Sequence, residues 1–169
     1  MADEVSIESL RTAIRNRGAE ADSGEAARLE ALARGYEACV RDLVTELVTV
    51  ARQIPDLTVA VEDETEEFTS PAFPGRGVPI ESQRVRITLH EDFLLFDPTA
   101  EALASALGQV KISASRPIPF LIERTLYLIR PRSPQQKPYW ALRSVENPLQ
   151  FGTPFDRDAL LRMLHAVFA

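Results

Sequence analysis

The stretch that decides the fold is AARLEALARGYEACVRDLVTELVTVARQI, residues 26–54. Apolar side chains recur in it at steps of three and four residues, which predicts an amphipathic helix with a broad apolar face. Charged side chains fill the remaining positions, as expected of a solvated face. The apolar series is Leu29, Leu32, Tyr36, Cys39, Leu43, Leu47, Val50 and Ile54, widened on one side by Ala33, Val40, Val44, Val48 and Ala51.

Sequence signals mark both ends of this helix. Asp22 followed by Glu25 matches a capping box, and Pro55 disfavours helical geometry at Ile54. A helix over residues 26–54 would be about 43 Å long, as long as the expected diameter of about 40 Å for a compact chain of this size. We therefore expect it either to cross one whole face of the domain or to overhang that face and contact a partner.

The residues before this helix predict a second, shorter one. Ser6 is a good N-terminal cap, and Ile7, Leu10, Ala13 and Ile14 form an apolar edge over residues 6–16. Residues 17–24 contain two glycines and two acidic side chains, a composition typical of a turn. The first 54 residues are therefore predicted to form a helical hairpin.

Beyond Pro55 the apolar pattern changes from helical to alternating, which is typical of strands. Two further helices are predicted: a short one over residues 98–107, and a C-terminal one over 153–169 that starts at Thr153 and Pro154. The strand candidates are residues 57–62, 84–90, 93–96, 109–113, 120–129 and 139–145. The predicted fold is a single two-layer α+β domain over 1–169, with a helical hairpin over 1–54 and an antiparallel sheet of about five to seven strands over 55–150.

The strand candidate at residues 120–129 is apolar on both faces. Phe120, Ile122, Leu126 and Leu128 lie on one face, and Leu121, Tyr127 and Ile129 on the other. We therefore expect it to be central and covered on both sides. In this arrangement the long helix is mainly the layer over the sheet, and only its end near residues 29–36 stays available for another molecule.

Composition restricts the class of protein. The formal charge of −6 and the pI near 5.0 argue against nucleic acid or an anionic membrane as a partner. No apolar run approaches the roughly 18 residues that a membrane span requires, and the single Cys39 suits a reduced core position. We therefore expect a cytoplasmic protein.

The sequence carries none of the short motifs that bind nucleotides, catalytic zinc or an acyl-transfer nucleophile. With only two histidines, a histidine-based metal cluster is not expected either. This favours a protein that is not an enzyme and has neither cofactor nor metal. One enzymatic alternative stays open, a hydrolase in which His90 meets a carboxylate near Glu91 and Asp92.

One group of side chains suggests a ligand site on the polar face of the predicted sheet. Arginine donates paired hydrogen bonds to carboxylate or phosphate, and aromatic rings supply rigid contact area. The candidates for binding an anionic small molecule are Arg84, Arg86, His90, Arg124, Tyr139, Trp140 and Arg143. The competing interpretation is that these arginines form structural ion pairs.

The function predicted from these patterns is a non-enzymatic interaction or adaptor-like domain that forms a homodimer through the long helix or a sheet edge. The anion-binding domain is the alternative. Residues 54–69 hold six acidic and no basic side chains, and residues 116–147 hold six basic and two acidic ones. This separation either improves solubility or orients a self-complementary contact. The predicted interface residues are Leu29, Leu32, Tyr36 and Phe73.

Overall fold

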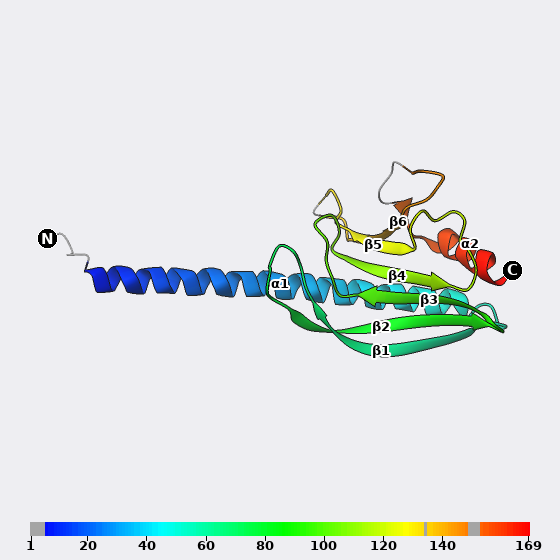
Figure 1. The fold of residues 1–169 in the computed structure, drawn as a ribbon, viewed down its shortest axis with the longest axis horizontal. Helices are drawn as coiled ribbons and strands as arrows, with labels where there is room; N and C mark the ends of the chain where they lie inside the picture. The colour runs from blue at the N-terminus through cyan, green and yellow to red at the C-terminus, as the bar shows by residue number, and fades with distance from the viewer. Residues whose placement is uncertain (1–5, 134, 149–152) are drawn as a thin grey trace.

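The computed structural model describes residues 6–133, 135–148 and 153–169. The predicted boundary between sheet and C-terminal helix, residues 150–152, lies outside them. The elements are α1 (Ile7–Ala51), β1 (Thr58–Phe68), β2 (Val78–Leu89), β3 (Asp92–Thr99), β4 (Gly108–Ala114), β5 (Thr125–Ile129), β6 (Tyr139–Leu142), β7 (Thr153–Pro154) and α2 (Arg157–Phe168). The strands form one antiparallel sheet in chain order, a meander (Figure 1). The predicted α+β class, with a long helix on an antiparallel sheet and a C-terminal helix, is confirmed.

The predicted helical hairpin is wrong, because α1 is one unbroken helix of 45 residues. Its N-terminal cap is Ser6, whose side chain accepts the Ser9 N–H as expected. The predicted turn at residues 17–24 is helical throughout. Each isolated glycine costs about 1 kcal/mol in a helix, and the Ala, Arg and Glu residues around Gly18 and Gly24 favour helix enough to continue it.

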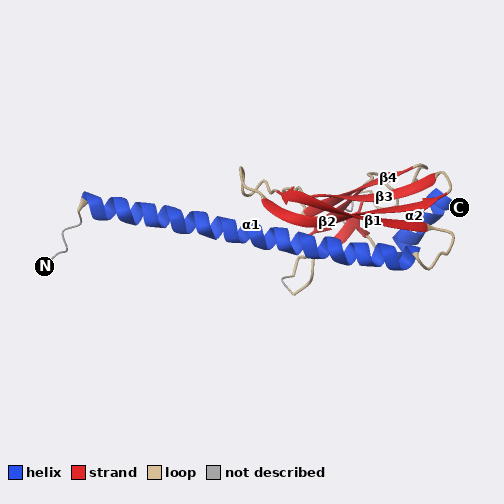
Figure 2. Cartoon of the chain, turned by 90° about the horizontal axis from the view of Figure 1, so that it is seen from below, coloured by secondary structure: helices blue, strands red, loops and turns tan. Residues whose placement is uncertain are grey.

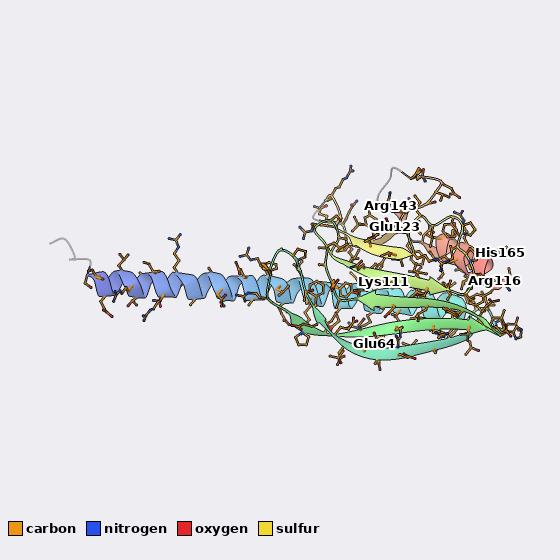
Figure 3. The ribbon with its side chains drawn as sticks, viewed as in Figure 1. Glu64, Lys111, Arg116, Glu123, Arg143 and His165 are labelled. Atoms are coloured by element: carbon orange, nitrogen blue, oxygen red, sulfur yellow. The ribbon has the colours of Figure 1, made fainter. Side chains whose placement is uncertain are left out.

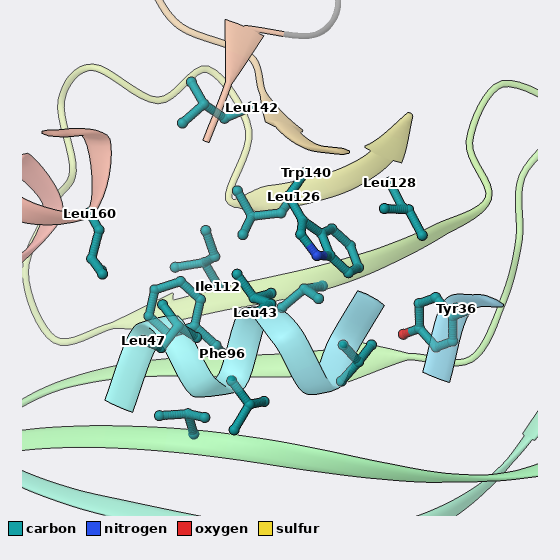
Figure 4. Packing of buried hydrophobic residues seen from close by; sticks show 14 of the residues in the cluster. Tyr36, Leu43, Leu47, Phe96, Ile112, Leu126, Leu128, Trp140, Leu142 and Leu160 are labelled. Atoms are coloured by element: carbon teal, nitrogen blue, oxygen red, sulfur yellow. The ribbon is translucent and has the colours of Figure 1, made fainter. Parts of the chain in front are cut away.

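One face of the sheet packs on the C-terminal half of α1, whose buried residues lie between Leu29 and Ala51 (Figure 2). Leu43 and Leu47 of the helix lie among Phe96, Ile112 and Leu126 of the strands (Figure 4). All five side chains are buried, as the amphipathic pattern predicts. This single apolar cluster also takes in α2, so helix and sheet share one core.

The helix also takes the place of a strand beside part of β2. The ladder between β2 and β3 covers only Val85–Leu89, which leaves the first half of β2 without a strand on that side. There the Glu37 carboxylate accepts the backbone N–H of Glu81 at 2.8 Å. Tyr36, one residue earlier, packs on Phe68 with ring centroids 5.4 Å apart. Where β3 does not pair with β2, α1 therefore lies beside β2.

The short helix predicted at residues 98–107 is absent. Asp97 and Pro98 continue β3, opposite Lys111 and Val110 of β4. Pro98 lies beyond the last β2–β3 pair, so its missing N–H breaks no ladder bond on that side. The chain then bonds to the end of β1, where Thr69 exchanges backbone hydrogen bonds of 2.9 Å with the 100–102 segment.

The C-terminal helix is present but starts later than predicted. Thr153 and Pro154 form β7, paired with β6, and the cap of α2 is Asp156, whose side chain accepts the Ala159 N–H at 2.8 Å. Its buried residues are Leu160, Met163, Leu164 and Val167, and His165 is exposed as expected.

The second face of the sheet is open, against the expectation of two covering layers. In β5, Leu126 and Leu128 are buried against α1, whereas Thr125, Tyr127 and Ile129 on the other face are only half-buried. The strand predicted over residues 120–129 shortens to Thr125–Ile129. Among the helices that the structure describes, none has the length and apolar character to cross a lipid bilayer.

Candidate functional site

The predicted anion-binding residues do not converge. Arg84 on β2 is held by acidic neighbours on β1, with its Nε 3.2 Å from Glu62 and an Nη 3.3 Å from Glu64. Arg86 instead stacks over the Phe93 ring, its guanidinium carbon 4.6 Å from the centroid. Both arginines are thus used within the sheet itself.

Arg143 belongs to a separate cluster (Figure 3). Its guanidinium donates to Glu123 at 2.8 Å, and the Tyr127 hydroxyl donates to the other oxygen of the same carboxylate at 2.6 Å. The Tyr127 hydrogen bond, followed by Arg143, lowers the pKa of Glu123. This geometry favours the structural ion pair over a free anion site.

The other four candidates lie apart as well. The exposed Arg124 reaches the Ala114 carbonyl at 3.4 Å, and His90 lies at the β2–β3 turn with a positive φ of 54°. Tyr139 is exposed. Trp140 is buried, where its indole N–H donates to the Cys39 carbonyl at 3.2 Å. The half-buried Cys39 packs against the core, and burial raises the pKa of its thiol.

A polar cleft of about 300 Å³ lies between α1 and the first two strands. It is lined by four acidic side chains, Glu37, Asp63, Glu64 and Glu81, and by one cation, Arg41. Glu37 is engaged by Arg34 and Arg41. This excess of carboxylates is unsuited to an anion, and no cluster of potential metal ligands occurs among the described residues.

Two of the four predicted interface residues belong to the core. Leu29 and Tyr36 are each only 1% exposed. The Tyr36 hydroxyl lies 3.0 and 3.1 Å from the carbonyls of Thr99 and Gln109, and burial raises the pKa of its hydroxyl. Leu32 and Phe73 are half-buried against the same cluster. Leu29 and Tyr36 are therefore occupied within the chain, and Leu32 keeps only part of its surface.

The exposed apolar side chains of α1 lie instead at its N-terminal end. Residues 7–23, which we call the arm, extend beyond the sheet (Figures 1 and 2) and are exposed throughout. Ile7, Leu10 and Ile14 are 75%, 53% and 62% exposed. At spacings of three and four residues they share one side of the helix. Their apolar spacing is visible in the sequence, but we expected these side chains to pack within the chain as part of a helical hairpin.

A second cavity, of about 530 Å³, lies beside Leu32, on the part of α1 that packs on the sheet. We call it the Leu32 cavity. Its lining is mostly apolar and comes from α1, from the end of β1 and from the loops at residues 70–72 and 102–107: Leu32, Phe68, Pro71, Ala72, Ala102, Leu103, Ala106 and Leu107, with Ser70, Ala104, Ser105 and Arg130 at the remaining positions.

The loop between β1 and β2 braces the base of the arm. Its Arg76 bonds to Asp22 and lies 3.8 Å from Glu25, both on α1. Their side chains stay 71% and 50% exposed. These ion pairs link the loop to α1 and leave both carboxylates largely exposed.

Comparisons with family models, with curated proteins and with solved structures find no match for this chain. The geometry of the chain must therefore carry any functional argument.

Proposed function

We propose that this chain is a protein-interaction domain that self-associates through the arm. The observation that carries the proposal is the exposure of Ile7, Leu10 and Ile14 along one side of α1, where the helix extends beyond the sheet. Contiguous exposed apolar side chains on an otherwise polar surface are characteristic of contact sites.

Helix energetics support a partner for the arm. A free helix of 12–15 residues is only marginally stable in water, and most helices depend on packing of an apolar face. The arm is about 25 Å long and has no such packing in the single chain. A second helix along its apolar side would supply it.

The magnitudes favour a moderate affinity. Fully burying an Ile or Leu side chain contributes roughly 1.5–3 kcal/mol, so the six side chains of two arms contribute on the order of 9–18 kcal/mol. Association costs on the order of 4–15 kcal/mol, and burial in a two-helix contact is incomplete. We therefore expect a dimer with a Kd in the micromolar range.

Sedimentation equilibrium of the wild type and of Leu10→Glu tests the proposal. The variant places a charge on the apolar side of the arm, and we expect it to sediment as a monomer at concentrations where the wild type is dimeric. The control is the exposed Thr12→Glu, which adds the same charge on the opposite side of the arm and should leave the dimer intact. A wild type that stays monomeric at about 100 μM, well above a micromolar Kd, would overturn the proposal.

A further inference from the structure

We propose that two copies pair their arms in antiparallel orientation, centred near Ala19, so that Ile7 of each copy enters the Leu32 cavity of the other. This inference rests on the proposed function and adds the orientation, the register and the second contact site. Three independent features of the chain support it.

The first feature is the charge along the arm. Residues 8–17 carry Arg11, Arg15 and Arg17 against a single Glu8, whereas residues 18–25 carry only acidic charges, Glu20, Asp22 and Glu25. Antiparallel pairing sets the basic half of one arm beside the acidic half of the other. Parallel pairing in register would instead set like charges together, with Arg17 facing its own copy.

The pairing of individual charges fixes the centre. When the two arms cross near residues 18–19, three pairs of opposite charges from the two copies lie close enough to interact: Arg11 with Glu25, Arg15 with Asp22, and Arg17 with Glu20. Asp22 and Glu25 already contact Arg76 of their own chain, but their exposed surfaces leave room for a second cation.

The second feature is a pair of glycines, Gly18 within the arm and Gly24 directly after it. A methyl group added at Gly18 or Gly24 would meet no atom within 4 Å, so nothing inside the chain requires glycine at either position. Glycine lowers helix stability relative to alanine. Close approach of a second helix is one reason to keep it. In the proposed register Gly18 lies beside the centre and Gly24 lies opposite Ile14 of the second copy.

The third feature is the position of the Leu32 cavity. Leu32 follows Ile14 by 18 residues, or five turns, and therefore projects from the same side of α1. In the antiparallel arrangement, the N-terminal end of a second arm that lies along this side is directed towards the cavity. With the crossing near Ala19, Ile7 of the second copy lies opposite Ala31, next to Leu32. The charge pairs place Ile7 opposite residues 29–30 and the cavity places it beside Leu32, so the two features agree to within about one helical turn.

Cysteine cross-linking of the full chain tests this arrangement. In a Cys39→Ala background, one preparation carries Ile7→Cys and the other Leu103→Cys, at the rim of the Leu32 cavity. Within one chain the two positions are separated by about 37 Å of helix, so a disulfide between them reports a contact between copies. We expect an oxidised mixture to give a dimer joined through residues 7 and 103, and either preparation alone to give little cross-linked product.

The alternatives are distinguishable. Efficient cross-linking of Ile7→Cys with itself would indicate parallel arms and overturn the inference while leaving self-association standing. A dimer in sedimentation whose mixture does not cross-link would also overturn it. A monomer in sedimentation would remove the proposed function together with the inference.

A charge exchange provides a second measurement. Arg17→Glu alone and Glu20→Arg alone should each weaken the dimer, by about tenfold for two altered pairs. The double variant Arg17→Glu/Glu20→Arg should restore it, because each copy then again presents opposite charges to the other. Failure of the double variant to recover affinity would contradict the antiparallel register.

Discussion

At the residue scale, Tyr36 was correctly predicted to lie on the apolar side of the helix but wrongly predicted to contact another molecule. Its place on the helical stripe predicted burial or contact, and the structure buries it against Phe68 and Trp140. Its hydroxyl meets the carbonyls of Thr99 and Gln109 at the ends of two strands. The sequence could not show this, because the contacts join residues more than 60 positions apart.

We expect Tyr36→Phe to lower the free energy of unfolding by about 1–2 kcal/mol. The variant keeps the ring packing but leaves the two carbonyls without the hydroxyl donor. Urea unfolding followed by circular dichroism measures the change. The control is Tyr139→Phe, which removes an exposed hydroxyl and should alter stability by less than about 0.5 kcal/mol. Equal effects at the two positions would show that the Tyr36 hydroxyl contributes nothing specific.

Glu66 on β1 provides a pH-dependent prediction. One of its carboxylate oxygens is buried without a hydrogen-bond partner, and burial, followed by the charges of Glu64 and Asp97, raises its pKa above the ordinary 4.5. A raised pKa means that the folded state disfavours the charged form. Glu66→Gln should therefore stabilise the protein at pH 7, on the order of 0.5–1 kcal/mol after solvent screening.

The difference in stability between Glu66→Gln and the wild type should favour Gln at neutral pH and decrease towards zero as the pH falls. As the pH falls through the raised folded pKa towards 4.5, Glu66 takes up a proton and becomes neutral like glutamine. Thermal unfolding at pH 7, 5.5 and 4 measures the difference. Glu67→Gln, which removes the same charge from an exposed neighbour, is the control; an advantage of Glu66→Gln that persists unchanged at pH 4 would contradict the burial argument.

At the element scale, the regular parts of the chain could be predicted and the breaks between them could not. The buried face of α1 and the alternation of β2 follow from local apolar periodicity, which the sequence displays directly. Gly18, Gly24 and Pro98 were expected to end or start elements, and each was overruled by its surroundings. A glycine costs about 1 kcal/mol, which neighbouring residues can outweigh, and Pro98 lies where β3 has no partner on one side.

The glycines in and directly after the arm also provide a prediction. Gly18→Ala and Gly24→Ala should each stabilise the helix of the single chain, by up to about 1 kcal/mol, yet weaken the dimer because the added methyl group separates the two arms. Gly35→Ala is the matched control, since it also has open space around it but lies beyond the proposed contact between the two copies. Circular dichroism and sedimentation equilibrium measure the two effects. A dimer that is unchanged or tighter in Gly18→Ala would exclude a close helix contact there.

At the scale of the whole molecule, the candidate anion site depends on which strands are neighbours, and the sequence alone did not predict this. Arg84 and Arg86 lie on a strand as predicted, whereas Arg124 and Arg143 lie just outside β5 and β6. In each case the neighbouring strands decide which side chains the arginine meets. Arg84 lies opposite Glu62 in the β1–β2 register, and Arg143 reaches Glu123 from beyond the end of β6. The sequence contains no direct record of this pairing, so it could not separate ion pairs from a ligand site.

The arm was missed for a different reason. Ile7, Leu10 and Ile14 were recognised as an apolar edge, and a fold-back at residues 17–24 was the simplest way to bury them within the chain. The continuous α1 removes that option and leaves the three side chains exposed. The apolar edge on which the proposed self-association rests was therefore visible in the sequence but was assigned to an intramolecular contact.

The distance between spin labels on the two copies tests the antiparallel dimer most directly. A label at the exposed Ala38, in a Cys39→Ala background, lies outside the arm on the body of each copy. Arms crossing near Ala19 separate the two labels by about 57 Å along the helix axis. Pulsed electron paramagnetic resonance should give a single distance distribution near that value, whereas a distribution at about 10–20 Å, typical of parallel helices packed side by side, would contradict the proposed arrangement.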